Sequence, residues 1–283
     1  MSEAACNNID LPKMSRRTFL KYSSFIHKEL GIKMPIVKLT MLQSRLSKRL
    51  KITGYSSFEE YYNYVFSPEG KKNELFNMID VVTTNKTHFF RESTHFNFLT
   101  EKVLPQLTAS TRKILLWSAG CSTGEEAYTL SMVIGNHLDK NFPGFNFSIL
   151  ATDISCRVLD KAKLGEYTTE QIESVPLELR KKYLLRGRNN KNGYIKIKPF
   201  LKSHIKFERL NLLSGNYNFT GNMDIIFCRN VIIYFDKDTQ KRVISQFCRN
   251  LNPRGYLFLG HSETLNDPGL PLYQVAPTVY RMK

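Results

Sequence analysis

The 283-residue chain has few cysteines, few acidic residues and no long apolar run. Its five cysteines are scattered and contain no C-x-x-C pair, which argues against a cysteine zinc site and against a disulfide framework. Its apolar runs fall far short of the ~20 residues that a membrane-spanning helix needs. These absences exclude a disulfide-stapled secreted domain and a membrane-spanning protein, and they indicate reduced thiols, as in the cytosol.

The segment 15–21 is similar to a twin-arginine export signal, because Arg16 and Arg17 stand side by side. An apolar stretch should follow such a signal. Here charged residues and a histidine interrupt the positions that come next. We therefore expect a cytoplasmic protein.

Positive charge is in excess and is distributed unevenly. The chain has 41 lysines and arginines against 25 aspartates and glutamates, which gives a formal net charge of +16. Residues 13–51 contain 11 basic and one acidic residue, and residues 178–209 contain 11 basic and two acidic residues. Basic surfaces of this kind bind nucleic acid, an anionic membrane or an acidic protein surface, and composition does not choose among these partners.

A strand, a glycine-bearing turn and a helix are predicted between residues 114 and 126. The apolar run 114–117 has the length of a buried strand, and Gly120 and Gly124 lie in the turn that follows. In open parallel sheets, this arrangement presents a nucleotide at the carboxyl ends of the strands. The glycine spacing is not the full dinucleotide fingerprint, so the turn alone is a weak signal.

Acidic residues follow this turn and end the next predicted strand. Glu125 and Glu126 would repel a phosphate at the start of the helix but would suit a ligand with a cationic centre. Alternatively, Thr123 and Glu126 form a capping box, and the sequence leaves both explanations open. Asp153 ends the second strand, where nucleotide-binding sheets hold ribose hydroxyls, although aspartate also caps helices.

Residues 15–82 have helical periodicity with short breaks, whereas residues 1–14 lack periodicity and are predicted to be a disordered tail. One predicted helix carries basic residues beside its apolar face and has no acidic residue between positions 38 and 51. A solvated helix stabilised by paired charges is therefore excluded, and a docking face is favoured. The predicted docking residues are Lys38, Arg45, Lys48 and Arg49.

Beyond the second predicted strand, strands and helices continue to alternate, as in an α/β fold with a mainly parallel sheet. Residues 193–198 and 203–208 alternate with period two and carry lysines, which predicts a basic hairpin inserted into this pattern. The parallel order then resumes with strands near 207–211, 224–230 and 256–260. Two short strands close the chain.

Five motifs give the chain a specific resemblance. They are TTNKTHFFRE (83–92), WSAGCSTGEEAYT (117–129), ATDIS (151–155), FCRNVIIYFD (227–236) and LNPRGYLFLGHSE (251–263). From about residue 15 onward, the chain resembles chemotaxis-receptor glutamate O-methyltransferases, the CheR family. The resemblance implies a class I S-adenosylmethionine-dependent, Rossmann-like fold, whose mainly parallel sheet has an antiparallel last strand. It also implies a helical domain at 15–82 and a catalytic domain at 83–283, with a small β-subdomain inserted at about 186–207.

The resemblance also implies the functional residues. Cofactor contacts are expected at Asn85, Thr87, Arg91, Glu126, Asp153, Asn211, Leu212, Arg229 and Asn230. A glutamate carboxylate is ionised at neutral pH, since its ordinary pKa is about 4.3, and it can take the sulfonium methyl group without a general base or a metal. The products are a methyl ester and S-adenosylhomocysteine. Arg91 is expected to orient the substrate carboxylate, and Tyr234 is expected to donate a hydroxyl near the methyl group.

The implied partner is the helical bundle of a chemoreceptor cytoplasmic domain, whose glutamates lie in acidic surroundings. Some family members also bind a receptor C-terminal tail through the β-subdomain, and the sequence leaves this open here. We expect a monomer that neither inserts into a membrane nor binds nucleic acid. The alternative of a nucleic-acid methyltransferase is disfavoured, because Arg229 and Asn230 follow the fourth strand without the Pro-Pro of such sites. A non-catalytic cofactor-binding module would more readily have lost Arg91, Glu126 or Asp153.

Overall fold

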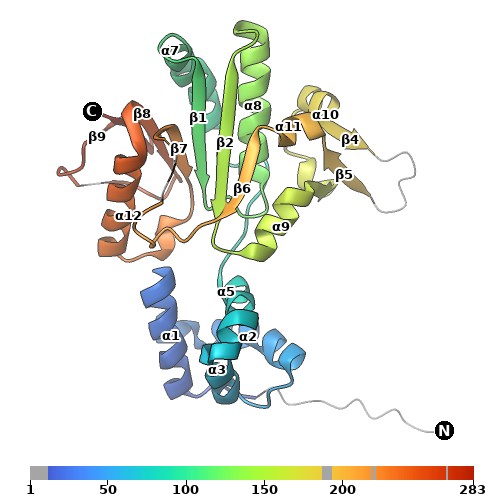
Figure 1. Cartoon of the computed structure of the whole chain (residues 1–283), viewed down its shortest axis with the longest axis vertical. Coiled ribbons are helices and arrows are strands. Elements are labelled where there is room, and N and C mark those ends of the chain that lie inside the picture. The colour runs from blue at the N-terminus through green and yellow to red at the C-terminus, as the bar shows by residue number, and fades with distance from the viewer. Residues whose placement is uncertain (1–11, 187–192, 218, 220, 266) are drawn as a thin grey trace. The chain divides into compact units, whose positions relative to one another are not determined.

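The computed structural model describes residues 12–186, 193–217, 219, 221–265 and 267–283. The chain divides into two compact units, Met1–Thr84 and Asn85–Lys283 (Figure 1). Of the tail expected at 1–14, residues 1–11 lie outside the described part. Met14 is already buried, and its N–H donates to Gln43 Oε1 at 2.8 Å.

The N-terminal unit is helical, and its helices pack around tyrosines and leucines. Ser15 begins the first helix by accepting a hydrogen bond from the Thr18 N–H, and Gly31 ends it with a φ of 68° that favours glycine. Tyr22 and Tyr61 are fully buried between the helices. The elements are α1 (Arg16–Leu30), η1 (Ile36–Lys38), α2 (Leu39–Thr53), α3 (Phe58–Phe66), α4 (Pro68–Asn73) and α5 (Leu75–Val82).

Arg49 lies in a largely buried ion pair with Glu74. Its Nε and Nη2 donate to the two carboxylate oxygens of Glu74 at 2.7 and 2.6 Å, and the Tyr61 hydroxyl donates to the same carboxylate. This bidentate pair joins α2 to the segment that leads into α5. The helical stripe could not reveal this partner, which lies 25 residues away, and the docking role of Arg49 stays a prediction.

The other predicted docking residues differ in how far the domain itself uses them. Arg45 donates to the Val82 carbonyl at 2.6 Å and to the Thr84 hydroxyl at 3.0 Å, so it holds the end of α5. Lys38 donates to a backbone carbonyl at 3.3 Å and is half-buried. Lys48 is exposed.

Replacing Glu74 by glutamine should destabilise the N-terminal unit by on the order of 3 kcal/mol at pH 7, because Arg49 would lose its anionic partner. Burial opposes ionisation of this carboxyl, but hydrogen bonds from Arg49, Tyr61 and Asn77 outweigh it and lower the pKa of Glu74. Its contribution is therefore present above the unfolded-state pKa of about 4.3 and is lost as pH falls through the lower folded-state value. In urea unfolding, the difference between wild type and Glu74→Gln should shrink below about pH 4, whereas exposed Glu69→Gln should match wild type throughout.

The second unit contains a seven-stranded sheet in the order β6-β2-β1-β7-β8-β10-β9. β1 pairs in parallel with β2 and with β7, whereas β10 runs antiparallel to β8 and to β9. The predicted mainly parallel sheet with an antiparallel last strand is confirmed. The strands are β1 (Lys113–Ala119), β2 (Asn146–Asp153), β6 (Ile205–Arg209), β7 (Met223–Cys228), β8 (Leu251–Leu259), β9 (Leu272–Ala276) and β10 (Val279–Met282).

Helices cover both faces of this sheet. Successive residues of its central strands point to opposite faces, and both faces are apolar. Ile114 and Phe227 pack against α8 and the helical segment around Phe96, whereas Trp117 and Ile226 pack against α12. The helical elements are α6 (Thr94–Phe98), η2 (Leu99–Val103), α7 (Leu104–Thr108), α8 (Glu125–Asn141), α9 (Cys156–Leu164), η3 (Glu170–Ile172), α10 (Leu177–Tyr183), α11 (Pro199–Lys202), η4 (Ile232–Tyr234) and α12 (Lys237–Asn250).

The predicted basic hairpin is wrong in its pairing. β5 (Tyr194–Ile197) lies between β3 (Glu166–Thr168) and β4 (Leu184–Arg186) in a separate three-stranded sheet, so this small sheet begins well before residue 186. The segment expected as the second hairpin strand is instead β6, at the edge of the main sheet and parallel to β2. Period-two alternation identifies a strand but not its partner.

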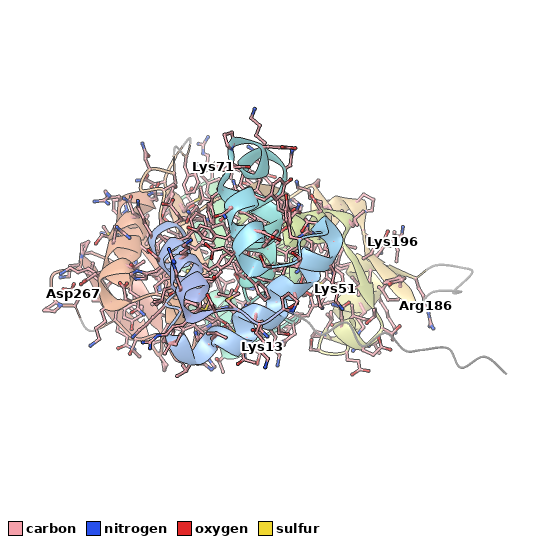
Figure 2. The ribbon with its side chains drawn as sticks, turned by 90° about the horizontal axis from the view of Figure 1, so that it is seen from below. Lys13, Lys51, Lys71, Arg186, Lys196 and Asp267 are labelled. Carbon is pink, nitrogen blue, oxygen red and sulfur yellow. The ribbon has the colours of Figure 1, made fainter. Side chains whose placement is uncertain are left out.

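The lysines of the predicted hairpin are accordingly divided between the two sheets. Lys196 and Arg186 extend from the small sheet in Figure 2, and Lys196 pairs with Glu166 at 2.7 Å. Lys206, on β6, pairs with Glu208. Lys198 and Lys202 donate to backbone carbonyls, and Lys191 lies outside the described residues. Across the described ranges, no helix is both long and apolar enough to cross a membrane.

Candidate active site

The predicted cofactor residues gather where the strand order reverses. The chain leaves β1 for β2 on one side and reaches β7 on the other, so the carboxyl ends of these three strands meet at a topological switch point, which we call the crevice. Open α/β sheets bind ligands at such a switch point. Asp153 ends β2, Arg229 and Asn230 follow β7, and Glu126 lies in the first turn of α8 after β1.

The turn between β1 and α8 requires glycine. Gly120 and Gly124 have φ values of 82° and 95°, in the left-handed region that side chains rarely adopt. A Cβ at position 120 would meet Val231 Cγ2 at 2.4 Å, and a Cβ at position 124 would meet Ala162 Cβ at 2.9 Å. The turn therefore packs tightly against the segment that follows β7 and against α9.

Backbone donors fix the Asp153 carboxylate at the end of β2. Its Oδ2 accepts from the Ser122 N–H at 2.9 Å, and its Oδ1 accepts from the Ser155 N–H at 3.0 Å. Ser122, which donates to this carboxylate, has a positive φ of 49°. Asp153 thus connects the glycine turn to β2 and is held in one orientation.

Glu126 and Arg229 form a buried ion pair at the centre of the crevice. Glu126 Oε1 accepts from the Ser118 hydroxyl at 2.6 Å, and Oε2 accepts from Arg229 Nε at 2.8 Å. The Arg229 side chain is 2% exposed. Its Nη1 also donates to the Arg91 carbonyl at 2.6 Å, so a single guanidinium joins α8, β7 and the segment 85–92.

The capping-box explanation of Glu126 is wrong. α8 begins after Gly124 and has no side-chain cap, and the Glu126 carboxylate is directed to Ser118 and Arg229. Glu125 is buried and accepts from the Thr123 hydroxyl at 2.6 Å, and burial raises its pKa. Of the two glutamates, Glu126 belongs to the crevice network, whereas Glu125 lies in the packed turn.

The segment 85–92 is packed against the rest of its unit. Phe89 is fully buried against Tyr128 and Tyr167, and the Phe90 N–H donates to the Thr129 hydroxyl at 3.2 Å. The Ser122 hydroxyl donates to the Asn85 carbonyl at 2.8 Å. Among its predicted site residues, Asn85, Thr87 and Arg91 are half-buried, and Arg91 Nη1 donates to the Lys86 carbonyl at 3.1 Å.

Glu263 orders the turn after β7 and was missed by the sequence prediction. Its carboxylate accepts from the backbone N–H groups of Asn230, Ile233 and Gly260 at 2.8, 3.2 and 2.6 Å. Burial raises the pKa of Glu263. Its sequence signal was its place at the end of the motif 251–263, just after β8. Within the described part of the chain, Asn230 Oδ1 is a buried acceptor with no hydrogen-bond partner, and so suits a ligand that donates an N–H.

The remaining predicted residues lie at the margins of this arrangement. Asn211 and Leu212 follow β6, where the Asn211 side chain accepts from the Leu213 N–H at 3.0 Å and Leu212 is buried. Tyr234 is half-buried in η4, four residues after Asn230.

One cluster of described residues has metal-ligating groups. Glu92, His95 and His261 place ligand atoms within 4.8 Å of one another. Burial and the neighbouring Arg229 charge lower the pKa of His95 to about 4, so its ring is neutral at pH 7. Arg229 Nη1 lies 3.4 Å from His95 Nδ1 and 3.6 Å from Glu92 Oε2. A guanidinium in this position disfavours a metal cation, and the cluster is better explained as the surroundings of Arg229.

Comparison with known proteins gives a consistent result over the whole chain. Residues 85–279 match the family described as "CheR methyltransferase, SAM binding domain", and residues 17–83 match "CheR methyltransferase, all-alpha domain". The chain is 38% identical to the chemotaxis protein methyltransferase of Borreliella burgdorferi, covering 97% of this chain and 95% of the relative. It is 36% identical to chemotaxis protein methyltransferase 2 of Pseudomonas aeruginosa (94% and 93% covered) and 35% identical to the chemotaxis protein methyltransferase of Escherichia coli (89% and 86% covered).

Proposed function

The chain belongs to the CheR methyltransferase family, and on that premise we propose that it methylates glutamate side chains of chemoreceptor cytoplasmic domains. The products are a glutamate 5-O-methyl ester and S-adenosylhomocysteine. Its relatives are named chemotaxis protein methyltransferases. The observation that carries the proposal is the crevice at β1, β2 and β7, where a buried Glu126–Arg229 pair also holds the segment that bears Arg91.

S-adenosylmethionine is the cofactor of this family, and the crevice suits it. Asp153 offers a fixed carboxylate for ribose hydroxyls at the position that nucleotide-binding sheets use. Asn230 Oδ1 offers a buried acceptor for an N–H donor.

The reaction requires alignment more than acid–base chemistry. When bound, S-adenosylmethionine supplies an electrophilic methyl group, and an ionised glutamate can attack it in line without a base. In our proposal Arg91 orients that glutamate, and the Tyr234 hydroxyl donates toward the reacting atoms. The packed phenylalanines of segment 85–92 limit water, so two opposite charges meet in a partly desolvated site and disappear together.

The basic N-terminal unit is proposed to dock the acidic receptor bundle in the cytoplasm, with the enzyme acting as a monomer. Of the residues first expected to dock, Lys38 and Lys48 remain candidates, whereas Arg45 and Arg49 bind groups of their own domain. The nucleic-acid methyltransferase alternative has no support from the site, because β7 runs into Arg229 and Asn230 without a Pro-Pro pair.

Label transfer tests the proposal directly. Wild-type protein with methyl-tritiated S-adenosylmethionine should label receptors in receptor-rich membranes, and mild base should release the label as methanol, because esters hydrolyse under those conditions. Boiled enzyme and membranes without receptors serve as controls. Label that resists base, or that enters nucleic acid instead of receptor, would overturn the proposal.

A further inference from the structure

Asn230, the second residue after β7, is held by its main chain and by one end of its side-chain amide. It has a positive φ of 59°, and its N–H donates to Glu263 Oε2 at 2.8 Å. A Cβ at Gly260 would lie 2.7 Å from Asn230 Nδ2, so the neighbouring chain closely surrounds this end of the amide. Within the described ranges, Asn230 Oδ1 is buried and has no hydrogen-bond partner.

Glu92 binds the nitrogen end of the Asn230 amide. Its Oε1 accepts from Asn230 Nδ2 at 3.3 Å and from the His261 N–H at 3.2 Å. Burial opposes ionisation of this carboxyl, but the His261 N–H, the Arg229 charge and the Asn230 amide outweigh it and lower the pKa of Glu92. Glu92 is therefore ionised at neutral pH, and both of its oxygens can only accept hydrogen bonds.

Glu92 also lies near Arg229, but Arg229 makes its hydrogen bonds elsewhere. Arg229 Nη1 is 3.6 Å from Glu92 Oε2, which is too far for a hydrogen bond. The same guanidinium donates to the Arg91 carbonyl at 2.6 Å and to Glu126 at 2.8 Å. Glu92 has a φ of 53°, which glutamate rarely adopts, so the fold holds this residue in a strained conformation. The hydrogen bonds of its carboxylate thus serve Asn230 and the chain after β8.

The orientation of the Asn230 amide decides what kind of ligand group it can bind. An asparagine amide has a donor end and an acceptor end, and its neighbours determine which end faces a ligand. Because the Glu92 carboxylate only accepts, it holds the NH2 end. Oδ1 is the end without a partner, so position 230 suits a ligand group that donates. An uncharged residue at position 92 would also permit the reverse orientation.

The strand order indicates which part of the cofactor meets this acceptor. Asp153, proposed above for the ribose, ends β2, and the buried Leu212 follows β6 on the far side of β2. With the adenine ring beside Leu212, the methionine portion extends the other way, toward β1 and β7, where Asn230 lies. The α-ammonium group is the hydrogen-bond donor of that portion, whereas its carboxylate only accepts.

We propose that Glu92 is a positioning residue, which fixes the Asn230 amide so that Oδ1 accepts from the α-ammonium group of S-adenosylmethionine. Glu92 acts through Asn230 and does not itself touch the cofactor. The proposal concerns the cofactor alone, so it does not depend on which carboxylate receives the methyl group. A receptor that stays unmethylated would contradict the proposed function and leave the binding results below as they are.

Two analogues of S-adenosylhomocysteine separate the groups of its amino-acid portion. The deamino analogue, an adenosylthiobutanoate, keeps the carboxylate and lacks the ammonium group. The decarboxylated analogue, an aminopropylthioadenosine, keeps the amine and lacks the carboxylate. In calorimetric titration of the wild-type full chain, S-adenosylhomocysteine should bind at least about tenfold more tightly than the deamino analogue, because a hydrogen bond to a charged donor is lost.

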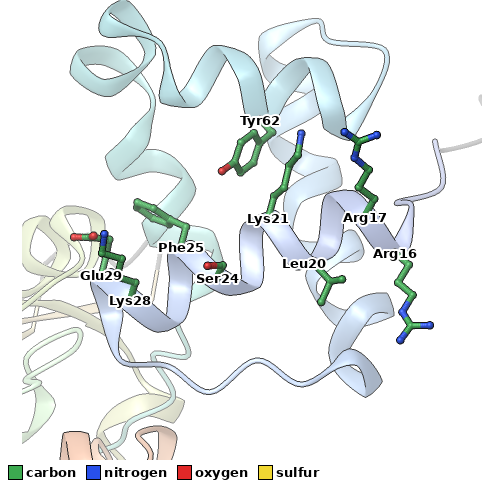
Figure 3. Close-up of a pocket in the computed structure, with 9 residues that line it drawn as sticks. All are labelled: Arg16, Arg17, Leu20, Lys21, Ser24, Phe25, Lys28, Glu29 and Tyr62. Atoms are coloured by element: carbon green, nitrogen blue, oxygen red, sulfur yellow. The ribbon is translucent and has the colours of Figure 1, made fainter.

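Glu92→Gln should remove this discrimination. The glutamine NH2 can donate to Asn230 Oδ1 and occupy the acceptor, so S-adenosylhomocysteine and the decarboxylated analogue should each bind about tenfold more weakly. Binding of the deamino analogue should change by less than about twofold. The matched control is Glu29→Gln, which removes the same charge from an exposed position near the end of α1 (Figure 3). This control should bind all three ligands as wild type does.

The double variant Glu92→Gln/Asn230→Asp tests the orientation itself, because it exchanges the carboxylate and the amide between the two positions. The introduced glutamine can donate to one oxygen of the introduced carboxylate, and the other oxygen remains as an acceptor. This variant should again prefer S-adenosylhomocysteine over the deamino analogue by at least about tenfold. Thermal unfolding of each variant shows whether it is folded under the conditions of the titration.

Three results would overturn the proposal. Equal weakening of all three ligands in Glu92→Gln would make Glu92 a structural residue, as would failure of both Glu92 variants to fold. Equal affinity of the wild type for S-adenosylhomocysteine and its deamino analogue would show that the ammonium group has no acceptor here. A double variant that folds but does not discriminate would show that the amide orientation is not what Glu92 controls.

Discussion

Replacing Arg229 with methionine should abolish cofactor binding and lower the stability of the second unit by about 3–5 kcal/mol. The Arg229 side chain is 2% exposed, and its Nε pairs with the Glu126 carboxylate at 2.8 Å. Its Nη1 lies 3.6 Å from Glu92 Oε2. Methionine has a similar length but no charge, so the Glu126 carboxylate would lose its partner in a buried site. The Arg91 carbonyl would also lose its donor, and the segment 85–92 would be less firmly held.

Thermal unfolding and calorimetric titration with S-adenosylhomocysteine measure the two effects separately. Exposed Arg249→Met is the matched control and should behave as wild type. The double variant Arg229→Met/Glu126→Gln should recover part of the lost stability, because the unpaired carboxylate is removed, but it should not recover ligand binding. An Arg229→Met protein that melts and binds as wild type does would show that this ion pair does not organise the crevice.

Replacing Arg91 with alanine should mainly lower turnover and should largely spare stability and ligand binding. We expect turnover to fall about 100-fold or more, a loss of about 3 kcal/mol of transition-state stabilisation, while S-adenosylhomocysteine binding weakens less and stability is retained. The Arg91 side chain is half-buried and donates to the Lys86 carbonyl, so its removal strands no buried charge. The Arg91 carbonyl that receives Arg229 would remain in the alanine variant.

Turnover with saturating cofactor and receptor-rich membranes is the measurement for this variant, together with calorimetric binding of S-adenosylhomocysteine. Arg91→Lys should recover part of the rate, because it keeps the charge but not the planar fork of donors. If Arg91 paired too tightly with the substrate glutamate, it would stabilise the carboxylate before the reaction. We therefore expect Arg91 to bind that carboxylate with modest affinity. Unchanged turnover in Arg91→Ala would remove Arg91 from the mechanism.

Much of the sheet was predictable because its central strands are apolar and short. The strand at 114–117 and the one ending at Asp153 appear as β1 and β2, in parallel register. The pairing of the basic segments was not predictable, since alternation in residues 203–208 carries no information on the neighbouring strand. That segment pairs with β2, more than 50 residues earlier in the chain.

The sequence indicated where the candidate site residues lie along the fold, but it did not indicate their contacts. Asp153 and Glu126 were expected near the cofactor, and both lie at the crevice. The partner of Glu126, however, is Arg229, 103 residues later, and a local capping box had competed with it. Arg49 shows the same limit, because its partner Glu74 lies 25 residues away and the helical stripe gave no sign of it.

The segment 85–92 is held in place largely through its main chain. Side chains from three other parts of the unit, Ser122, Ser174 and Arg229, donate to its carbonyl groups at residues 85, 89 and 91. Because these anchors bind main-chain carbonyls, substitutions of the side chains at positions 87 and 91 leave them intact. Variants at these two positions should therefore keep the segment attached, so a loss of turnover in them can be assigned to the altered side chain itself.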